Sequence, residues 1–367
     1  MKNIFNSPKL ANPLPTHDNF ETAPVNIAFV LTGGGSKGAF EAGVVEAVIP
    51  QLQQIGKISL FTGTSAGAVN AIAVGGGLNA SGTDEAILRL RHTWNEVTSY
   101  GQIFSRYLRF MTDPFLPKDQ RWPNLPQLPF NPMQVFQPFM PSLTAQFISA
   151  TVKQVTNDWS SEIQNGAVKI AINTILEDRQ NPGKFEHVVL TGRDLTPDGV
   201  GGSANLKQLG VHYIRDTANP LHQGRRAYDG AYQENGLLHP YLDDTITDYI
   251  MIILHDRRHN NLDKVGALKH AEIHEHALAL VTSDSHAPAR LHAIEIESLG
   301  GEIDGLSHIN DSSKFNTSQE FIDLLYASGV AAGKKWLQDN LCHVGGETSS
   351  YKLYPPALKQ LAEMSYV

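Results

Sequence analysis

The sequence has little of what several protein classes require. Its single cysteine, Cys342, excludes an internal disulfide framework and a multi-cysteine metal site, and it fits a reduced, intracellular setting. Charged residues make up only 18% of the chain, below the roughly 25% that is usual for soluble domains. Acidic residues outnumber basic ones, 37 to 29, and the formal net charge is −8. This balance argues against a nucleic-acid groove and against electrostatic capture by anionic lipid.

Long apolar runs are also absent. A membrane-spanning helix needs about 18 uninterrupted apolar residues, and the most apolar stretch, 66–77, is interrupted by Asn70 and ends in three glycines. The first 20 residues lack the apolar core of a signal peptide. The sequence therefore indicates a cytoplasmic protein that at most visits a membrane surface, while export through a signal-independent secretion system, as an effector, stays open.

What is present is an alternation of apolar strands and helices. Residues 25–32 and 57–63 are apolar runs that stop at small residues, and helical spacing follows each of them, over 39–52 and 65–74. Strand, glycine turn and helix, repeated twice, predict an α/β layered fold. Further strands are predicted over 168–176, 186–192, 248–255 and 291–298, and a last helix over 318–341.

The pattern predicts one main domain, residues 25–345, between an N-terminal tail, 1–24, and a C-terminal extension, 346–367. Within the domain, residues 100–142 hold eight of the twenty prolines and nine of the thirty aromatic residues. So much proline is not expected to continue a regular element. The segment has three interpretations: a lid over the site, a surface that touches lipid, or a packed excursion that lines the core or a subunit contact.

The first candidate for chemistry is Ser65, at the centre of a G-x-S-x-G pattern between Gly63 and Gly67. The pattern stands between a predicted strand and a predicted helix, which is the context of a nucleophile elbow. There the serine hydroxyl projects above the sheet, while nearby N–H groups and the helix dipole favour an oxyanion. The alternative is a glycine-rich turn whose serine merely caps a helix.

A glycine-rich loop precedes this serine by about thirty residues and consists of Gly33, Gly34, Gly35, Ser36, Lys37 and Gly38. Its G-x-G-x-x-G spacing is also found in dinucleotide folds, but the next strand ends in the G-x-S-x-G turn without the acidic residue that would hold a ribose. The spacing does not match a P-loop either. Backbone N–H groups in such a loop suit any anion, including a tetrahedral oxyanion.

A serine nucleophile needs a base, and the chain offers three Asp-Gly pairs. Asp198 and Asp304 stand in patterns typical of turns. Asp229 stands among aromatic residues that would exclude water around it. Because the ordinary aspartate pKa of about 3.9 makes a poor base, this desolvation would favour Asp229 by raising its pKa.

Together the three motifs resemble the patatin-like phospholipase family: GGGSKG its oxyanion loop, GTSAG its nucleophile elbow, and Asp229-Gly230-Ala231 its Asp-Gly-Gly/Ala motif. The resemblance implies a three-layer α/β/α fold with a mixed, mostly parallel sheet. It also implies a carboxylic ester hydrolase with a Ser65–Asp229 dyad, no metal, no cofactor, and a phospholipid or other acyl-lipid substrate. By the same resemblance, N–H groups around Gly34, Gly35 and Ser36 would stabilise the oxyanion, helped by Lys37 in place of the family's frequent arginine.

The sequence departs from the family in two places. Residues 215–226 carry His222, Arg225 and Arg226 where the family often has small residues ending in proline, and Thr32 stands where the family frequently has Asp or Ser. The departure at 215–226 bears on the shape and polarity of the acyl pocket and not on the dyad.

Other interpretations stay open. A Ser-Asp-His triad would have the right chain order with one of three histidines: His255, His259 or His292. The i, i+4 histidine pair in the group His270, His274 and His276 lacks a third spaced ligand, so a solvated charged face is favoured over zinc. A thioesterase or acyltransferase, a non-catalytic acyl-lipid-binding module and a dinucleotide-dependent oxidoreductase are the rival functions. The sequence does not indicate an oligomeric state.

Overall fold

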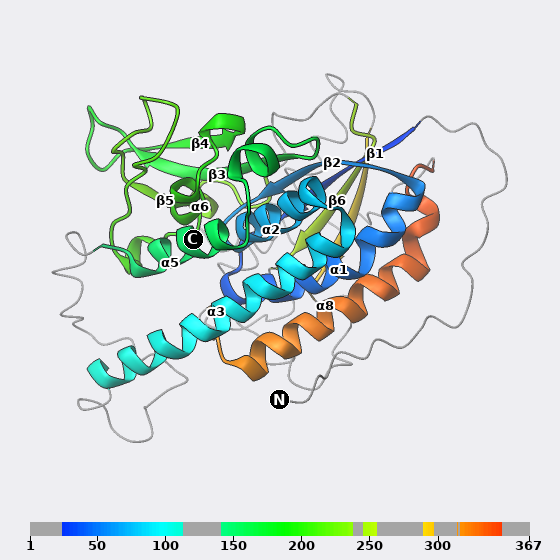
Figure 1. Cartoon of the computed structure of the whole chain (residues 1–367), viewed down its shortest axis with the longest axis horizontal. Coiled ribbons are helices and arrows are strands. Elements are labelled where there is room, and N and C mark those ends of the chain that lie inside the picture. Colours follow the sequence, from blue (N-terminus) through cyan, green and yellow to red (C-terminus); the bar gives the residue numbers. More distant parts are fainter. Residues whose placement is uncertain are drawn as a thin grey trace, which may run out of the picture.

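The computed structural model describes residues 24–112, 141–237, 245–254, 289–296, 314 and 316–346. Within these ranges the chain forms a seven-stranded sheet (Figure 1). Six strands follow one another in the order β4-β3-β2-β1-β6-β7, and the seventh, β5, pairs with β3 beside this path. The strands are β1 (Val25–Leu31), β2 (Gly56–Gly63), β3 (Lys169–Glu177), β4 (Phe185–Thr191), β5 (Ala227–Asp229), β6 (Asp248–Ile253) and β7 (Arg290–Glu295).

The centre of the sheet is parallel. Strand β1 pairs in parallel with β2 and β6, and the same direction continues to β3 on one side and β7 on the other. Strands β4 and β5 run antiparallel to β3. This arrangement confirms the predicted mixed, mostly parallel α/β sheet, and every strand predicted from an apolar run is present.

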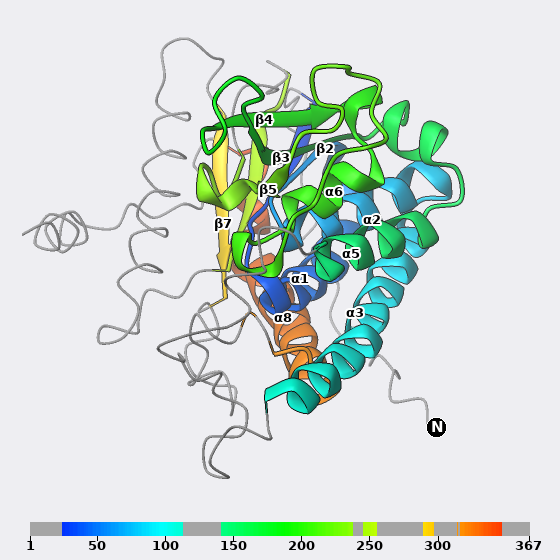
Figure 2. The same cartoon turned by 90° about the vertical axis from the view of Figure 1, so that its left-hand side faces the viewer.

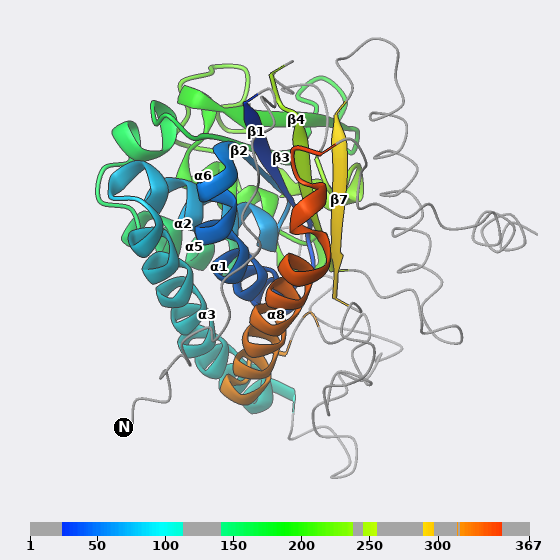
Figure 3. The same cartoon turned by 90° about the vertical axis from the view of Figure 1, so that its right-hand side faces the viewer.

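Six helices are described: α1 (Gly38–Ile55), α2 (Ala66–Ala80), α3 (Thr83–Thr112), α5 (Leu143–Gln154), α6 (Pro197–Ser203) and α8 (Gln319–Asn340). The two side views place all of them on one face of the sheet, with α1 and α8 side by side (Figures 2 and 3). The described residues thus show the sheet and one helical layer of the predicted three. No helix among them is long and apolar enough to cross a membrane.

Both faces of the sheet are buried. Ile27, Phe29 and Leu31 of β1 point to the face covered by the helices, while Ala28 and Val30 contribute to a second apolar cluster on the opposite face. Strands that are buried on both sides need apolar residues at every position, because successive side chains alternate between faces. This requirement explains why the predicted strands are continuous apolar runs.

Helix α3 differs from the expectation for residues 100–142. It continues through the first part of this segment to Thr112, because the eight prolines begin only at position 114. A helix is interrupted by proline and not by the aromatic residues that precede it here. The rest of the segment, from 113 to 140, lies outside the described residues, so its three interpretations stay predictions.

The prediction that Asp198 stands in a simple turn is wrong. Asp198 lies in the first turn of the short helix α6, whose N-cap Thr196 accepts a hydrogen bond from the N–H of Gly199 over 3.2 Å. Pro197 occupies the first helical position, where its fixed φ favours a helix start. The cap and this proline outweigh the turn preference of the Asp-Gly pair.

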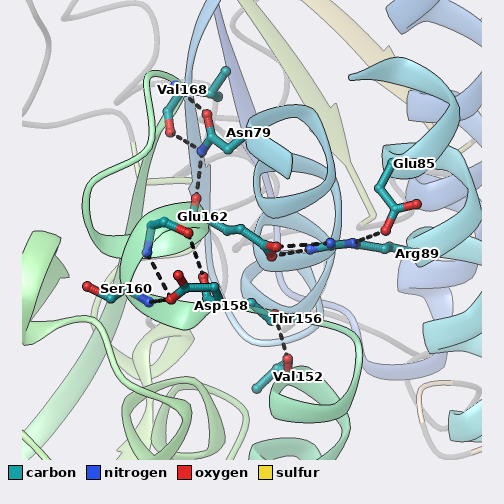
Figure 4. Close-up of polar contacts among 10 residues, drawn as sticks. Asn79, Glu85, Arg89, Val152, Thr156, Asp158, Ser160, Glu162 and Val168 are labelled. Atoms are coloured by element: carbon teal, nitrogen blue, oxygen red, sulfur yellow. Dashed lines mark hydrogen bonds and ion pairs between the residues drawn. The ribbon is translucent and has the colours of Figure 1, made fainter. Parts of the chain in front are cut away.

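A buried polar cluster joins α2 and α3 to a π-helical turn at Ser160–Gln164 (Figure 4). Arg89 of α3 pairs with Glu162 over 2.5 Å and with Glu85, one turn earlier on its own helix, over 2.7 Å. Asn79, in the last turn of α2, donates to the carbonyl groups of Glu162 and Val168 over 2.7 and 2.9 Å. The cluster therefore holds the far end of α2 against the start of β3.

Candidate active site

Ser65 lies where β2 turns into α2, as the N-cap residue of that helix. Its φ of +56° is the one positive φ of a non-glycine residue in the described ranges. A side chain in that region of φ/ψ space costs about 1–3 kcal/mol and persists only where the surroundings impose it. The main-chain N–H of Ser65 donates to Oγ of Ser203 over 3.0 Å, which adds a contact that holds the turn.

The glycines around Ser65 are required by close backbone approach. A Cβ added to Gly63 would lie 2.4 Å from the carbonyl oxygen of Gly67, and one added to Gly67 would lie 2.3 Å from the carbonyl oxygen of Leu31. Both distances are far below van der Waals contact. The G-x-S-x-G pattern therefore corresponds to a tight strand-to-helix turn packed on the end of β1.

Strand register brings Asp229 to the same level of the sheet as Ser65. Gly63 of β2 stands opposite Ile172 of β3, and two residues further along β3 Thr174 stands opposite Asp229. The Ser65 hydroxyl donates a hydrogen bond to the Asp229 carboxylate. Residues that are 164 positions apart in the sequence thus form a hydrogen-bonded pair, and both are largely buried, at 8% and 3% exposure.

Burial raises the pKa of Asp229 to about 6. Loss of hydration is the largest influence, and it is opposed by the hydrogen bond from Ser65, by the N–H of Ala231 at 2.9 Å and by the positive charge of Lys314. A carboxylate with this pKa is still ionised at neutral pH, yet it is a stronger base than an ordinary aspartate. It can therefore accept a proton from the serine to which it is bonded.

The glycine loop lies against the serine. A Cβ added to Gly33 would be 3.0 Å from Cβ of Ser65, and the N–H of Gly33 donates to Oδ1 of Asn235 over 2.6 Å. No described acceptor takes the N–H of Gly34. The N–H groups of Gly35 and Ser36 open a 3₁₀ turn, where helix geometry provides no internal partner. The donors that face an anion here would be those three, and not Gly33.

Buried side chains hold both ends of this loop. Glu41 of α1 accepts the N–H of Thr32, which precedes the loop, and Asn70 of α2 donates to the carbonyl oxygen of Gly38, which ends it, over 2.9 Å. Asn70 also donates to Glu41 over 2.8 Å and accepts from the indole N–H of Trp94. Burial raises the pKa of Glu41 well above its ordinary value, and the hydrogen bonds from Asn70 and Thr32 oppose the rise.

The remaining predicted site residues lie around this pair. Lys37 is only 3% exposed, so it is buried with the loop. Gly38 must lack a side chain, because a Cβ there would lie 2.7 Å from Cβ of Ala66. Gly230 packs on Asn173 with 2.5 Å to an added Cβ, and Ala231 supplies the N–H to Asp229.

Four residues at the site have no signal in the sequence that singles them out: Ser203, Asn205, Asn235 and Lys314. The main-chain carbonyl oxygen of Asn205 accepts a hydrogen bond from the N–H of Asp229 over 2.8 Å. The side-chain amide of Asn205 donates to the carbonyl oxygen of Ala227 over 3.0 Å. Each acts through contacts between distant segments, which residue patterns do not record.

The histidine of the alternative triad that the structure describes lies elsewhere. His292 is fully buried on β7, and its Nε2 lies 2.9 Å from Oδ1 of Asp248. His255 and His259 lie outside the described residues, as do Asp304 and the predicted histidine face at 270, 274 and 276. Among the residues that the structure describes, no histidine is recorded in contact with Ser65.

The polar residues at 215–226 make structural contacts. The Arg225 guanidinium donates to the carbonyl oxygens of Leu176 and Glu177 over 3.1 and 2.7 Å and pairs with Glu186. Arg226 lies near Glu177 and packs over the ring of Tyr213. This departure from the family pattern thus supports the turn that leads into β5.

Comparison with solved structures gave several chains of low identity. Human GIVD cytosolic phospholipase A2 is 11% identical, with a TM-score of 0.47, over 88% of this chain and 60% of that one. VipD from Legionella pneumophila is 11% identical, with a TM-score of 0.33, over 85% and 68%. ExoU of Pseudomonas aeruginosa, in complex with SpcU, is 14% identical, with a TM-score of 0.31, over 86% and 53%. The chain thus spans only part of the length of these proteins.

No curated protein sequence matches the chain. The family model of patatin-like phospholipases matches residues 29–183, which include the glycine loop and Ser65 but not Asp229. Over residues 29–183 the chain is therefore similar to the patatin-like phospholipase family.

Proposed function

We propose that the protein is a serine lipid acyl hydrolase of the phospholipase A or lysophospholipase type, a carboxylic ester hydrolase acting on (phospho)lipids. The observation that carries the proposal is the hydrogen bond from the strained Ser65 to the buried Asp229, beside a glycine loop whose N–H groups at Gly34, Gly35 and Ser36 have no acceptor among the described residues. Nucleophile, base and oxyanion donors within one site are the parts that acyl transfer needs.

In this proposal, Ser65 Oγ attacks the ester carbonyl carbon while its proton passes to Asp229. The negative charge that forms on the carbonyl oxygen is held by the N–H groups of Gly34, Gly35 and Ser36. The intermediate collapses to an acyl-serine, and the alcohol leaves with the proton from Asp229. Water then attacks the acyl-serine, gives a proton to Asp229, and releases the fatty acid and Ser65 with its proton restored.

The test is release of free fatty acid from mixed phospholipid vesicles. Ser65→Ala should reduce release at least about a thousandfold with an unchanged circular dichroism spectrum, because it removes the nucleophile and leaves the turn intact. Asp229→Asn should reduce it almost as far. Equal release by the wild type and Ser65→Ala would remove the assignment of Ser65.

A histidine variant distinguishes the dyad from a triad. His292→Ala should retain activity per folded molecule, because His292 bonds to Asp248 and not to the dyad. His255→Ala and His259→Ala are expected to behave in the same way. If a folded variant of any of the three loses hydrolysis, a Ser-Asp-His triad replaces the proposed mechanism.

A further inference from the structure

Lys314 belongs to the wall of the candidate site, although it is 249 positions from Ser65. Its carbonyl oxygen accepts a hydrogen bond from Oγ of Ser36 over 3.0 Å. A Cβ added to Gly35 would lie 2.4 Å from that oxygen and 2.9 Å from Cβ of Lys314. The backbone of Lys314 is therefore packed directly on the glycine loop, at the residues whose N–H groups face the proposed oxyanion.

The side chain of Lys314 places a positive charge near the base. The ammonium charge of Lys314 lowers the pKa of Asp229, although the Asp229 carboxylate is buried. Lys314 is also half-buried, so part of its side chain is accessible from outside. Lys314 thus contacts the loop, acts on the proposed base and is partly exposed.

The neighbouring described lysines are less suited to meet a substrate. Lys37 is only 3% exposed. Lys207 lies near the Asp-Gly-Ala turn, but its ammonium packs over the rings of Phe185 and Tyr232, with 4.2 and 4.8 Å to their centroids. Lys314 is thus the lysine that combines contact with the glycine loop and partial exposure.

From this placement we infer that Lys314 binds the phosphate of a phospholipid head group and makes phosphate-bearing acyl lipids better substrates than neutral acylglycerols. The inference rests on the proposed acyl hydrolase. An anionic phosphate that approaches an ionised Asp229 in a chain of net charge −8 is repelled unless a local cation compensates. An ammonium group does so as a point charge that needs no fixed fork geometry.

The test compares phosphatidylcholine and diacylglycerol that carry the same acyl chains, in the same detergent micelles. At pH 8 Asp229 is ionised in every variant, so substrate binding is separated from base protonation. Lys314→Met should lower kcat/KM for phosphatidylcholine about tenfold, mainly through KM, with a much smaller change for diacylglycerol. Lys314→Arg should retain most of the preference for phosphatidylcholine.

The side-chain substitution leaves the main-chain bond to Ser36 in place, so Lys314→Met is expected to fold. Lys335→Met, on the exposed side of α8 where Lys335 pairs with Asp339, is the matched control and should change neither substrate. As a second readout, Lys314→Met should move the acidic limb of the pH–rate profile to higher pH, because the charge that lowers the pKa of Asp229 is gone.

Three results would overturn the inference. One is an unchanged ratio of the two substrates in Lys314→Met, and another is an equal loss on both at pH 8, which would mean that Lys314 only supports the loop. A third is a phosphatidylcholine-specific loss in Lys207→Met instead. In each of these cases the proposed hydrolase function is unaffected. If the wild type releases no more fatty acid than Ser65→Ala from either substrate, both the proposed hydrolase function and the role of Lys314 are wrong.

Discussion

Asp229 combines two demands that oppose each other. As the proposed base it must be ionised when Ser65 gives up its proton, yet burial disfavours the ionised carboxylate and raises its pKa to about 6. The hydrogen bonds from Ser65 and from the N–H of Ala231 limit that rise. A pKa between the ordinary value and neutrality leaves the carboxylate ionised under neutral conditions and more basic than a solvated aspartate.

The pH dependence of hydrolysis follows from this pKa. Because only ionised Asp229 can accept the proton, kcat/KM should be level above about pH 7 and fall about tenfold per pH unit below pH 6. The measurement is kcat/KM on a soluble acyl ester from pH 4.5 to 9. A profile that stays level down to pH 4.5 would show that Asp229 does not act as the base.

At the scale of elements, the position of α2 matters because its N-terminus carries Ser65. The other end of α2 is held by Asn79, which bonds to the turn that contains Glu162 (Figure 4). Glu162 in turn pairs with Arg89 of α3, and both side chains are nearly inaccessible, at 8% and 4% exposure. Glu85 binds the same guanidinium but is 26% exposed.

Two matched substitutions test how much this buried pair stabilises the packing of α3. Glu162→Gln should lower the free energy of unfolding by about 3 kcal/mol, because Arg89 then lacks its buried counter-charge. Glu85→Gln should cost less than about 1 kcal/mol, because water already screens that partner. Urea unfolding of the two variants gives the comparison, and equal costs would contradict the assigned difference in burial.

The elements that the sequence predicts correctly are those with a local cause. The strand over 25–32 is a continuous apolar run that ends at glycines, and the Ser65 turn has small residues because backbone atoms approach within 2.4 Å of an added Cβ. Both causes leave a trace in neighbouring residues. The motif at Asp229 is equally local, so both members of the proposed dyad could be chosen from the sequence, although their catalytic role stays a prediction.

What the sequence could not show depends on contacts between distant segments. Strand β5 is three residues long and exists because it pairs with β3, so no periodicity marks it. Asn235 and Lys314 reach the glycine loop from 202 and 278 positions away. Single Asn and Lys residues are common in loops, and only the fold shows which of them contact the site.

At the scale of the molecule, the candidate site and a buried cluster around Asp248 lie at opposite ends of the sheet. The glycine loop and Ser65 follow the carboxyl ends of β1 and β2, where open α/β sheets place their sites. Asp248 begins β6 and so lies towards the opposite, amino end, fully buried. It accepts hydrogen bonds from Arg290 and His292 of β7 and from the N–H of Gly345, which follows α8.

Asp248 should make the stability of the whole molecule depend on pH. Burial alone would raise its pKa, but the bonds from Arg290, His292 and Thr247 outweigh burial and hold the pKa well below its ordinary value. A carboxyl group with a depressed pKa in the folded state stabilises the fold above its unfolded pKa of about 3.9. That stabilisation is lost as the pH falls below this value towards the folded pKa.

Asp248→Asn tests this dependence because it removes the charge and keeps the shape. At pH 7 the variant should lose about 3 kcal/mol or more of unfolding free energy, since Arg290 and His292 lose a buried anion. The deficit relative to the wild type should shrink as the pH falls below about 4, because the unfolded wild type then takes up a proton that the folded state does not. Asp339→Asn, which breaks only an exposed pair on α8, is the control and should stay near the wild type throughout. Urea midpoints measured between pH 3 and pH 7 decide the matter. A deficit that is constant with pH would mean that it comes from hydrogen bonds that Asn cannot accept, and that the charge of Asp248 does not couple β6, β7 and the segment after α8.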